Sequence, residues 1–196
     1  MQQVPRTKQR LKIVLVGNSG VGKTCLISSY LRHQFDPQSL ATVSPTYSSI
    51  DVKNSSGNFV CLEIWDTAGQ ERFHSVSQMF FRNSSIAMIC YEAGDKESAK
   101  SIPDWIEKVR DESPDCDIFI VITKSDLFSG KEHSLIMKES QQMFASLNPA
   151  RYFLTSAVSF KGIHELFIAA SDMPFQRKSE SEQCDVETEP QRKCRC

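Results

Sequence analysis

The stretch Gly17-Asn18-Ser19-Gly20-Val21-Gly22-Lys23-Thr24 has the G-x-x-x-x-G-K-[ST] pattern of a phosphate-binding loop. It directly follows an apolar run at 11–16 and precedes a helix-like segment that begins at Cys25. Glycines let such a loop curl until its backbone N–H groups converge on phosphate oxygens at the N-terminus of a helix. The stretch therefore predicts a strand, a loop and a helix that together hold a nucleoside phosphate.

The side chains of the loop fit the same chemistry. The Lys23 ammonium is expected near the β- and γ-phosphates, and the Thr24 hydroxyl is expected to bind Mg²⁺. The predicted phosphate-binding residues of the loop are Asn18, Ser19, Gly20, Val21, Gly22, Lys23 and Thr24.

The composition is that of one α/β domain with a tail, because the chain has 196 residues of which 40% are hydrophobic. A formal net charge of −1 gives no basic excess of the kind that binds nucleic acid. No apolar segment approaches the ~20 residues that span a bilayer, and residues 1–10 lack the apolar core of a signal peptide. We therefore expect a cytosolic protein whose seven cysteines are reduced.

Apolar runs alternate with segments of helical periodicity along the chain. The runs lie at 11–16, 50–52, 59–65, 86–91, 118–122 and 152–154, and the helical segments at 24–33, 97–112, 132–147 and 163–173. Pro103 is expected to kink the third helix or to delay its regular part to Asp104. The pattern predicts an α/β fold in three layers, a mostly parallel sheet with helices on both faces. This domain is expected to fill residues 11–174, after an extension at 1–10.

Two aspartates follow predicted strands, at the edge where parallel sheets bind ligands. Asp66 follows the strand at 59–65 and is expected to hold Mg²⁺, through water, beside the phosphate loop. Asp126 follows the strand at 118–122, and its carboxylate can accept hydrogen bonds from N1–H and the exocyclic amino group of guanine, which adenine lacks. The stem of Lys124 can lie along the base. The sequence therefore predicts a GTP site.

With these motifs in this order over residues 11–172, the chain resembles the small GTPases of the Ras superfamily, whose domain is a P-loop G-domain. Within that superfamily it is most similar to the Rab family. The Rab-like features are Trp65, the Asp-Thr-Ala-Gly-Gln-Glu segment at 66–71, the Arg-Phe-His-Ser-Val segment at 72–76, and Phe80-Phe81-Arg82-Asn83 in place of Tyr-Tyr-Arg-Gly.

The resemblance implies roles for further residues. Gln70 would orient the attacking water, the Gly69 N–H would contact the γ-phosphate, and Phe35 would pack on the guanine. Other interpretations stay open, because Phe35 would also suit the core at a helix end, and Gln70 would be a solvated loop residue if hydrolysis has been lost. The implied guanine-binding residues are Phe35, Thr123, Lys124, Asp126, Ser156, Ala157 and Val158.

Two threonines compete for a second hydroxyl contact with Mg²⁺. Thr46 follows Pro45, like the Pro-Thr pair of Ras proteins. Thr42 lies 18 residues after Thr24 and seven after Phe35, the spacing of Rab and Ras chains, whereas Thr46 would need a four-residue insertion before it. Thr42 is therefore the expected ligand, together with Thr24 and Asp66.

Thr123 and Val158 depart from the Rab pattern, which has Asn and Lys at these positions. The segment Thr123-Lys124-Ser125-Asp126 is called the base loop below. Exchanging the amide for a hydroxyl at Thr123 removes a hydrogen-bonding arm that would tie this base loop to the phosphate loop, at a cost of about 1 kcal/mol. Rho-family GTPases resemble the chain at both positions, but their helical insertion after Asp126 is missing here. We expect weaker binding of the same base. Because Pro45-Thr46 also alters the effector-binding segment, the identity of the effectors cannot be inherited from a standard Rab.

The chain ends Cys194-Arg195-Cys196, which resembles the Cys-x-Cys terminus on which Rab proteins carry two geranylgeranyl groups. Two lipid chains anchor a protein stably where one is marginal. The segment at 175–196 is poor in apolar residues and is expected to be a disordered tether. A surface disulfide or a metal-binding pair is the alternative for Cys194 and Cys196.

Together these features predict a Rab-like GTPase that binds GTP or GDP with Mg²⁺, hydrolyses GTP slowly and acts as a membrane-tethered switch in vesicle trafficking. It would lie on the cytosolic face of an intracellular membrane as a monomer. Its expected partners are an exchange factor, a GTPase-activating protein, effectors, the prenylation machinery and a lipid-binding solubiliser. The altered base loop and the altered segment at Pro45-Thr46 leave a second interpretation open, a nucleotide-binding adaptor of the same fold that does not cycle. A small P-loop kinase is a third interpretation, but the sequence has no recognisable lid arginines or acceptor site.

Overall fold

The computed structural model describes residues 9–39, 41–42, 44–67 and 79–174. In this part of the chain the strands form one sheet in the order β2-β3-β1-β4-β5-β6. They are β1 (Gln9–Val16), β2 (Thr46–Lys53), β3 (Phe59–Asp66), β4 (Ile86–Glu92), β5 (Asp117–Thr123) and β6 (Arg151–Leu154). β2 and β3 pair antiparallel, and the other neighbouring pairs are parallel, which confirms the predicted sheet.

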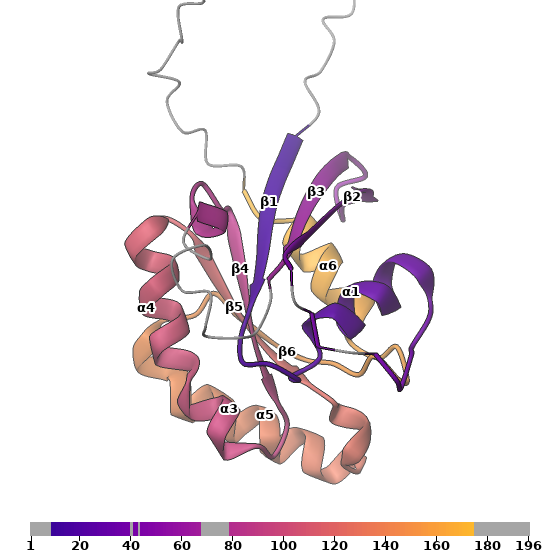
Figure 1. The fold of residues 1–196 in the computed structure, drawn as a ribbon, viewed down its shortest axis with the longest axis vertical. Coiled ribbons are helices and arrows are strands. Elements are labelled where there is room, and N and C mark those ends of the chain that lie inside the picture. Colours follow the sequence, from indigo (N-terminus) through magenta and orange to yellow (C-terminus); the bar gives the residue numbers. More distant parts are fainter. Residues whose placement is uncertain (1–8, 40, 43, 68–78, 175–196) are drawn as a thin grey trace, which may run out of the picture.

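Helices cover both faces of the sheet (Figure 1). α1 (Lys23–Arg32) and α6 (Ile163–Ser171) lie on one face, and α3 (Lys96–Lys100), α4 (Ile102–Glu112) and α5 (Gly130–Phe144) lie on the other. Side chains of β1 alternate between the two buried clusters, because Leu11, Ile13 and Leu15 join the first, whereas Val14 and Val16 join the second. None of the described helices is long and apolar enough to cross a bilayer.

The helix expected at 97–112 is two helices that meet at Ser101. Asp95 caps α3, because its carboxylate accepts hydrogen bonds from the N–H groups of Glu97 and Ser98. Pro103 stands in the first turn of α4, where a missing N–H costs nothing because that group would have no acceptor in the helix. The regular part of α4 therefore starts at Ile102, earlier than the expected Asp104.

The phosphate loop starts where β1 ends, at a residue that only glycine can fill. Gly17 has a φ of 139°, and a Cβ placed on it would lie 2.2 Å from the Cys90 carbonyl oxygen. The close approach of β4 therefore leaves no room for a side chain where the loop begins. Asp66 ends β3 at the same edge of the sheet, and the base loop follows β5, so the fold brings the sequence motifs to one rim.

Candidate functional site

The phosphate loop is organised around the buried side chain of Lys23 at the start of α1. Its Nζ donates hydrogen bonds to the Gly17 carbonyl at 2.7 Å and to the Asn18 carbonyl at 2.8 Å. Burial lowers the pKa of Lys23, and interactions with Cys90 and Asp66 act in the opposite direction. The loop borders a cavity of about 140 Å³ that opens between its glycines and Thr42.

Two hydroxyls and a carboxylate meet beside this loop. Thr24 Oγ1 donates to Asp66 Oδ2 at 2.6 Å and lies 2.5 Å from Thr42 Oγ1. Thr46 is not part of this group, because it opens β2, is exposed, and pairs with Asp66 only through the β2–β3 ladder. Of the two threonines that the sequence offered, the fold therefore brings Thr42 to Thr24.

Asp66 carries an unsatisfied oxygen at this point. Within the described residues, Oδ1 of Asp66 is buried and has no hydrogen-bond partner. Burial raises the pKa of the carboxyl group, whereas the hydrogen bond from Thr24 and the charge of Lys23 lower it. A buried carboxylate oxygen without a donor is costly, and a bound cation is one way of satisfying it.

A second cavity, of about 400 Å³, lies beside the residues that the sequence predicts to bind guanine. Gly20 and Gly22 line both cavities, so the two are adjacent. Ser156 donates a hydrogen bond to Asp126 Oδ1 at 2.5 Å, which holds the carboxylate in place. The side chains that line this cavity include Phe35, Thr123, Lys124, Asp126, Ala157 and Val158. Phe35 is 39% exposed, which argues against a core role at the helix end.

The expectation that Thr123 loses contact with the phosphate loop is wrong. Its hydroxyl donates to the Val21 carbonyl at 2.6 Å and also lies 3.0 Å from the Tyr91 carbonyl. A short side chain reaches the loop because Thr123 ends β5 in the buried floor of the site, where it is 4% exposed. The tie between base loop and phosphate loop is therefore present. Gly69 and Gln70, and Cys194 and Cys196 at the tail, lie outside the described residues.

Comparison of the sequence with known proteins shows the family of the chain. The model of the Ras family matches residues 12–173, which covers most of the chain. The chain belongs to the Ras family. It is 31% identical to the GTP-binding protein ypt5 of Schizosaccharomyces pombe over 168 residues, 85% of this chain and 79% of the relative. It is 32% identical to Rab-30 of Homo sapiens over 158 residues, 80% of this chain and 76% of the relative.

The resemblance of this small GTPase to Rab proteins is thereby confirmed. A Rho protein is also similar, because RHO4 of Saccharomyces cerevisiae is 32% identical over 176 residues, 86% of this chain and 60% of the relative. The chain is thus similar to proteins named Rab and to a protein named Rho at comparable identity.

Three contacts of the site have no signal in the sequence. Glu92 at the end of β4 forms an ion pair with Lys124 at 2.5 Å, and Ser29 of α1 donates to the Ala157 carbonyl at 2.8 Å. Trp105 of α4 donates from Nε1 to Asn18 Oδ1 at 3.0 Å. These contacts join residues that are 32, 128 and 87 positions apart in the sequence, so no local sequence pattern predicts them.

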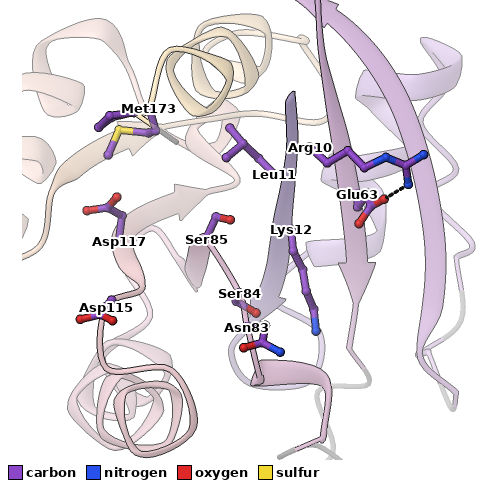
Figure 2. Close-up of a pocket in the computed structure, with 11 residues that line it drawn as sticks. Arg10, Leu11, Lys12, Glu63, Asn83, Ser84, Ser85, Asp115, Asp117 and Met173 are labelled. Atoms are coloured by element: carbon purple, nitrogen blue, oxygen red, sulfur yellow. Dashed lines mark hydrogen bonds and ion pairs between the residues drawn. The ribbon is translucent and has the colours of Figure 1, made fainter. Parts of the chain in front are cut away.

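A separate cavity of about 350 Å³ lies beside the start of β1 (Figure 2). It is lined by the first residues of β1, by Asp115 and Asp117 before and at the start of β5, and by Met173. Arg10, at its edge, points to Glu63 and forms an ion pair with it at 2.7 Å. Because none of the predicted nucleotide-binding residues lines it, this cavity is not part of the candidate site.

Proposed function

We propose that the chain is a Rab-type switch that binds GTP or GDP with Mg²⁺ and hydrolyses GTP slowly. The observation that carries the proposal is the hydrogen-bonded group of Thr24, Thr42 and Asp66 beside the phosphate loop. These residues are contributed by α1, the segment before β2, and β3. A segment that reaches over the loop to join this group is positioned to respond to the γ-phosphate.

The loop would bind the phosphates through its backbone N–H groups and through Lys23. An ammonium has three N–H donors, and the two hydrogen bonds of Lys23 to loop carbonyls leave one for a phosphate oxygen. The burial of Lys23 makes this charge effective, since a charge in a low-dielectric site is screened less by water.

Thr24, Thr42 and Asp66 would hold Mg²⁺, with Asp66 acting through a water molecule. The residues fit this cation because hydroxyl and carboxylate oxygens are the ligands it prefers. The unpartnered Asp66 Oδ1 is the sharpest sign of the fit, since it is buried beside the hydroxyls. When bound, Mg²⁺ would offset negative charge on the phosphate oxygens.

Asp126 would select guanine. Ser156 occupies its Oδ1, so the carboxylate is oriented before a nucleotide arrives and has remaining acceptor capacity for N1–H and the amino group. Phe35 would pack on one face of the base, and the stem of Lys124, fixed by Glu92, would lie along the other.

Hydrolysis would follow in-line attack by a water that Gln70 orients, with the Gly69 N–H on the γ-phosphate. The sequence offers no arginine in an evident position to stabilise the transition state from within the chain, because Arg72 matches an ordinary Rab residue. We therefore propose an intrinsic rate of about 10⁻⁴ to 10⁻² s⁻¹, which a GTPase-activating protein would raise.

Gln70→Leu is expected to slow single-turnover GTP hydrolysis at least about tenfold, because leucine cannot orient water by hydrogen bonds. The measurement is the release of inorganic phosphate from preloaded GTP, with the dissociation rate of GTP measured in parallel. An unchanged hydrolysis rate would show that Gln70 does not position the water.

Thr42→Ala is expected to speed GTP dissociation about tenfold in the presence of Mg²⁺ and to change GDP dissociation less, because this hydroxyl belongs to a segment that the γ-phosphate would order. Thr46→Ala is the matched control and should leave both rates within about twofold of wild type. The test is displacement of fluorescent mantGTP and mantGDP. A large effect of Thr46→Ala alone would reverse the assignment. Equal affinity of the wild type for GTP and GDP, with or without Mg²⁺, would favour the non-cycling adaptor.

The tail would carry two geranylgeranyl groups on Cys194 and Cys196 and tether the G-domain to the cytosolic face of an intracellular membrane, for vesicle trafficking. Support comes from the Cys-x-Cys ending and from the Rab-type relatives. Exchange factor, GTPase-activating protein, effectors, prenylation machinery and a solubiliser of the lipids are the partners such a switch requires.

Replacing both Cys194 and Cys196 by serine is expected to move the protein from the membrane pellet to the supernatant in fractionated eukaryotic cells, while GDP affinity stays unchanged. The reason is that geranylgeranyl groups can then no longer be attached at these two positions, and a net charge of −1 provides no basic excess to attract anionic lipids. Pelleting of the double variant at wild-type level would contradict lipid anchoring at this terminus.

A further inference from the structure

We infer that Trp105 is a positioning residue for the phosphate loop, which rests on the proposed role of that loop in nucleotide binding. The indole Nε1 of Trp105 donates to Asn18 Oδ1 at 3.0 Å, across 87 residues of sequence. The backbone carbonyl of the same Asn18 accepts a hydrogen bond from Lys23 Nζ at 2.8 Å. Asn18 is thus held on one side by α4 and on the other by the phosphate-binding lysine.

The loop needs such support because its backbone is unusual. Gly17, Gly20 and Gly22 have φ values of 139°, 80° and 96°, and glycine has no strong preference for any one of its allowed conformations. Asn18 is the first residue in the loop with a side chain, and it is only half-buried, so packing alone does not fix it. A hydrogen bond from a rigid helix restricts its movement.

Trp105 is well suited to provide this restraint. Its side chain is 6% exposed and belongs to the same buried cluster as Val14 and Val16 of β1, the strand that leads into the loop. A buried indole N–H requires an acceptor, and this one finds it in the loop rather than in its own helix. Lys108 lies over the indole ring at 4.7 Å from the ring centroid.

The test is the rate of mantGDP and mantGTP dissociation from the full chain. Trp105→Phe keeps an aromatic ring in the core but removes the N–H donor, and should raise both rates about fivefold. This factor corresponds to about 1 kcal/mol at 1.4 kcal/mol per tenfold change. Both nucleotides should be affected alike, because the bond acts on the loop and not on the γ-phosphate.

Matched variants separate positioning from packing. Lys108→Met removes the cation above the ring but keeps the indole N–H, so it should leave the two rates within about twofold of wild type. Asn18→Ala should raise the rates as Trp105→Phe does, and the double variant should be no faster than the faster single variant.

The indole N–H gives a readout independent of kinetics. The chain has two tryptophans, so its ¹H–¹⁵N spectrum should show two indole signals, one of which shifts on Asn18→Ala. Trp105→Phe that lowers the melting temperature but leaves both dissociation rates unchanged would overturn the inference and make Trp105 a core residue only. A faster release of GTP alone would overturn it too. Failure of the wild type to bind either nucleotide would instead refute the proposed function.

Discussion

Asp126→Asn is expected to lower the affinity for GTP and GDP by about 10²- to 10⁴-fold. The carboxylate would accept two hydrogen bonds from guanine, and hydrogen bonds to a charged group contribute about 1.5–3 kcal/mol each. An asparagine amide would instead turn a donor toward the donors of the base. Competition against mantGDP by GTP and ATP measures the loss. ATP that competes as well as GTP with the wild-type protein would refute guanine selection altogether.

Xanthosine triphosphate provides the complementary arm of this experiment. Xanthine has a carbonyl where guanine has the amino group, so the amide N–H that Asp126→Asn introduces could donate to it, and the variant should bind this nucleotide more tightly than wild type does. Asp172→Asn is the matched control, because Asp172 accepts hydrogen bonds from Ser55 far from the base cavity. It should leave nucleotide affinity unchanged, and a loss there would point to a general effect of lost charge.

The fold was predictable because its signals are local. Alternating apolar runs and helical periods indicate the mostly parallel sheet and both helical layers. The single helix expected at 97–112 was wrong because helical periodicity continues through Ser101, where the chain breaks between α3 and α4. Pro103 does mark a perturbation, but its effect depends on whether it falls in the first turn or in the interior of a helix.

The site was predictable where spacing along the chain carries the information. Thr42 rather than Thr46 meets Thr24, as counting from Thr24 suggested. The prediction for Thr123 was wrong because it compared only the lengths of a threonine and an asparagine side chain. The distance to the Val21 carbonyl, which decides whether the hydroxyl can reach it, is not contained in the sequence. The role of Trp105 was not predictable for a related reason. The packing of α4 against the sheet determines that the indole N–H of Trp105 meets Asn18, and no sequence motif encodes that packing.

Asp66→Asn is expected to speed mantGDP dissociation in the presence of Mg²⁺ by about 10- to 100-fold, the usual cost of losing a group that orients a metal through its outer shell. In wild type, removing Mg²⁺ with EDTA should speed dissociation strongly, whereas in the variant EDTA should add little. The amide still accepts the hydrogen bond from Thr24, so the hydroxyl group keeps its partner.

Asp66→Asn weakens nucleotide binding but is expected to stabilise the nucleotide-free protein against unfolding near neutral pH. Burial raises the pKa of Asp66, so the folded chain binds this proton more tightly than the unfolded chain does, and ionisation lowers stability as the pH rises through the raised pKa. The asparagine variant is spared that cost. Its free energy of unfolding relative to wild type should therefore increase from acid toward neutral pH, as urea denaturation at several pH values would measure. In the dissociation experiment, an Asp66→Asn protein that releases mantGDP as slowly as wild type and is still accelerated by EDTA would show that the cation lies away from Asp66.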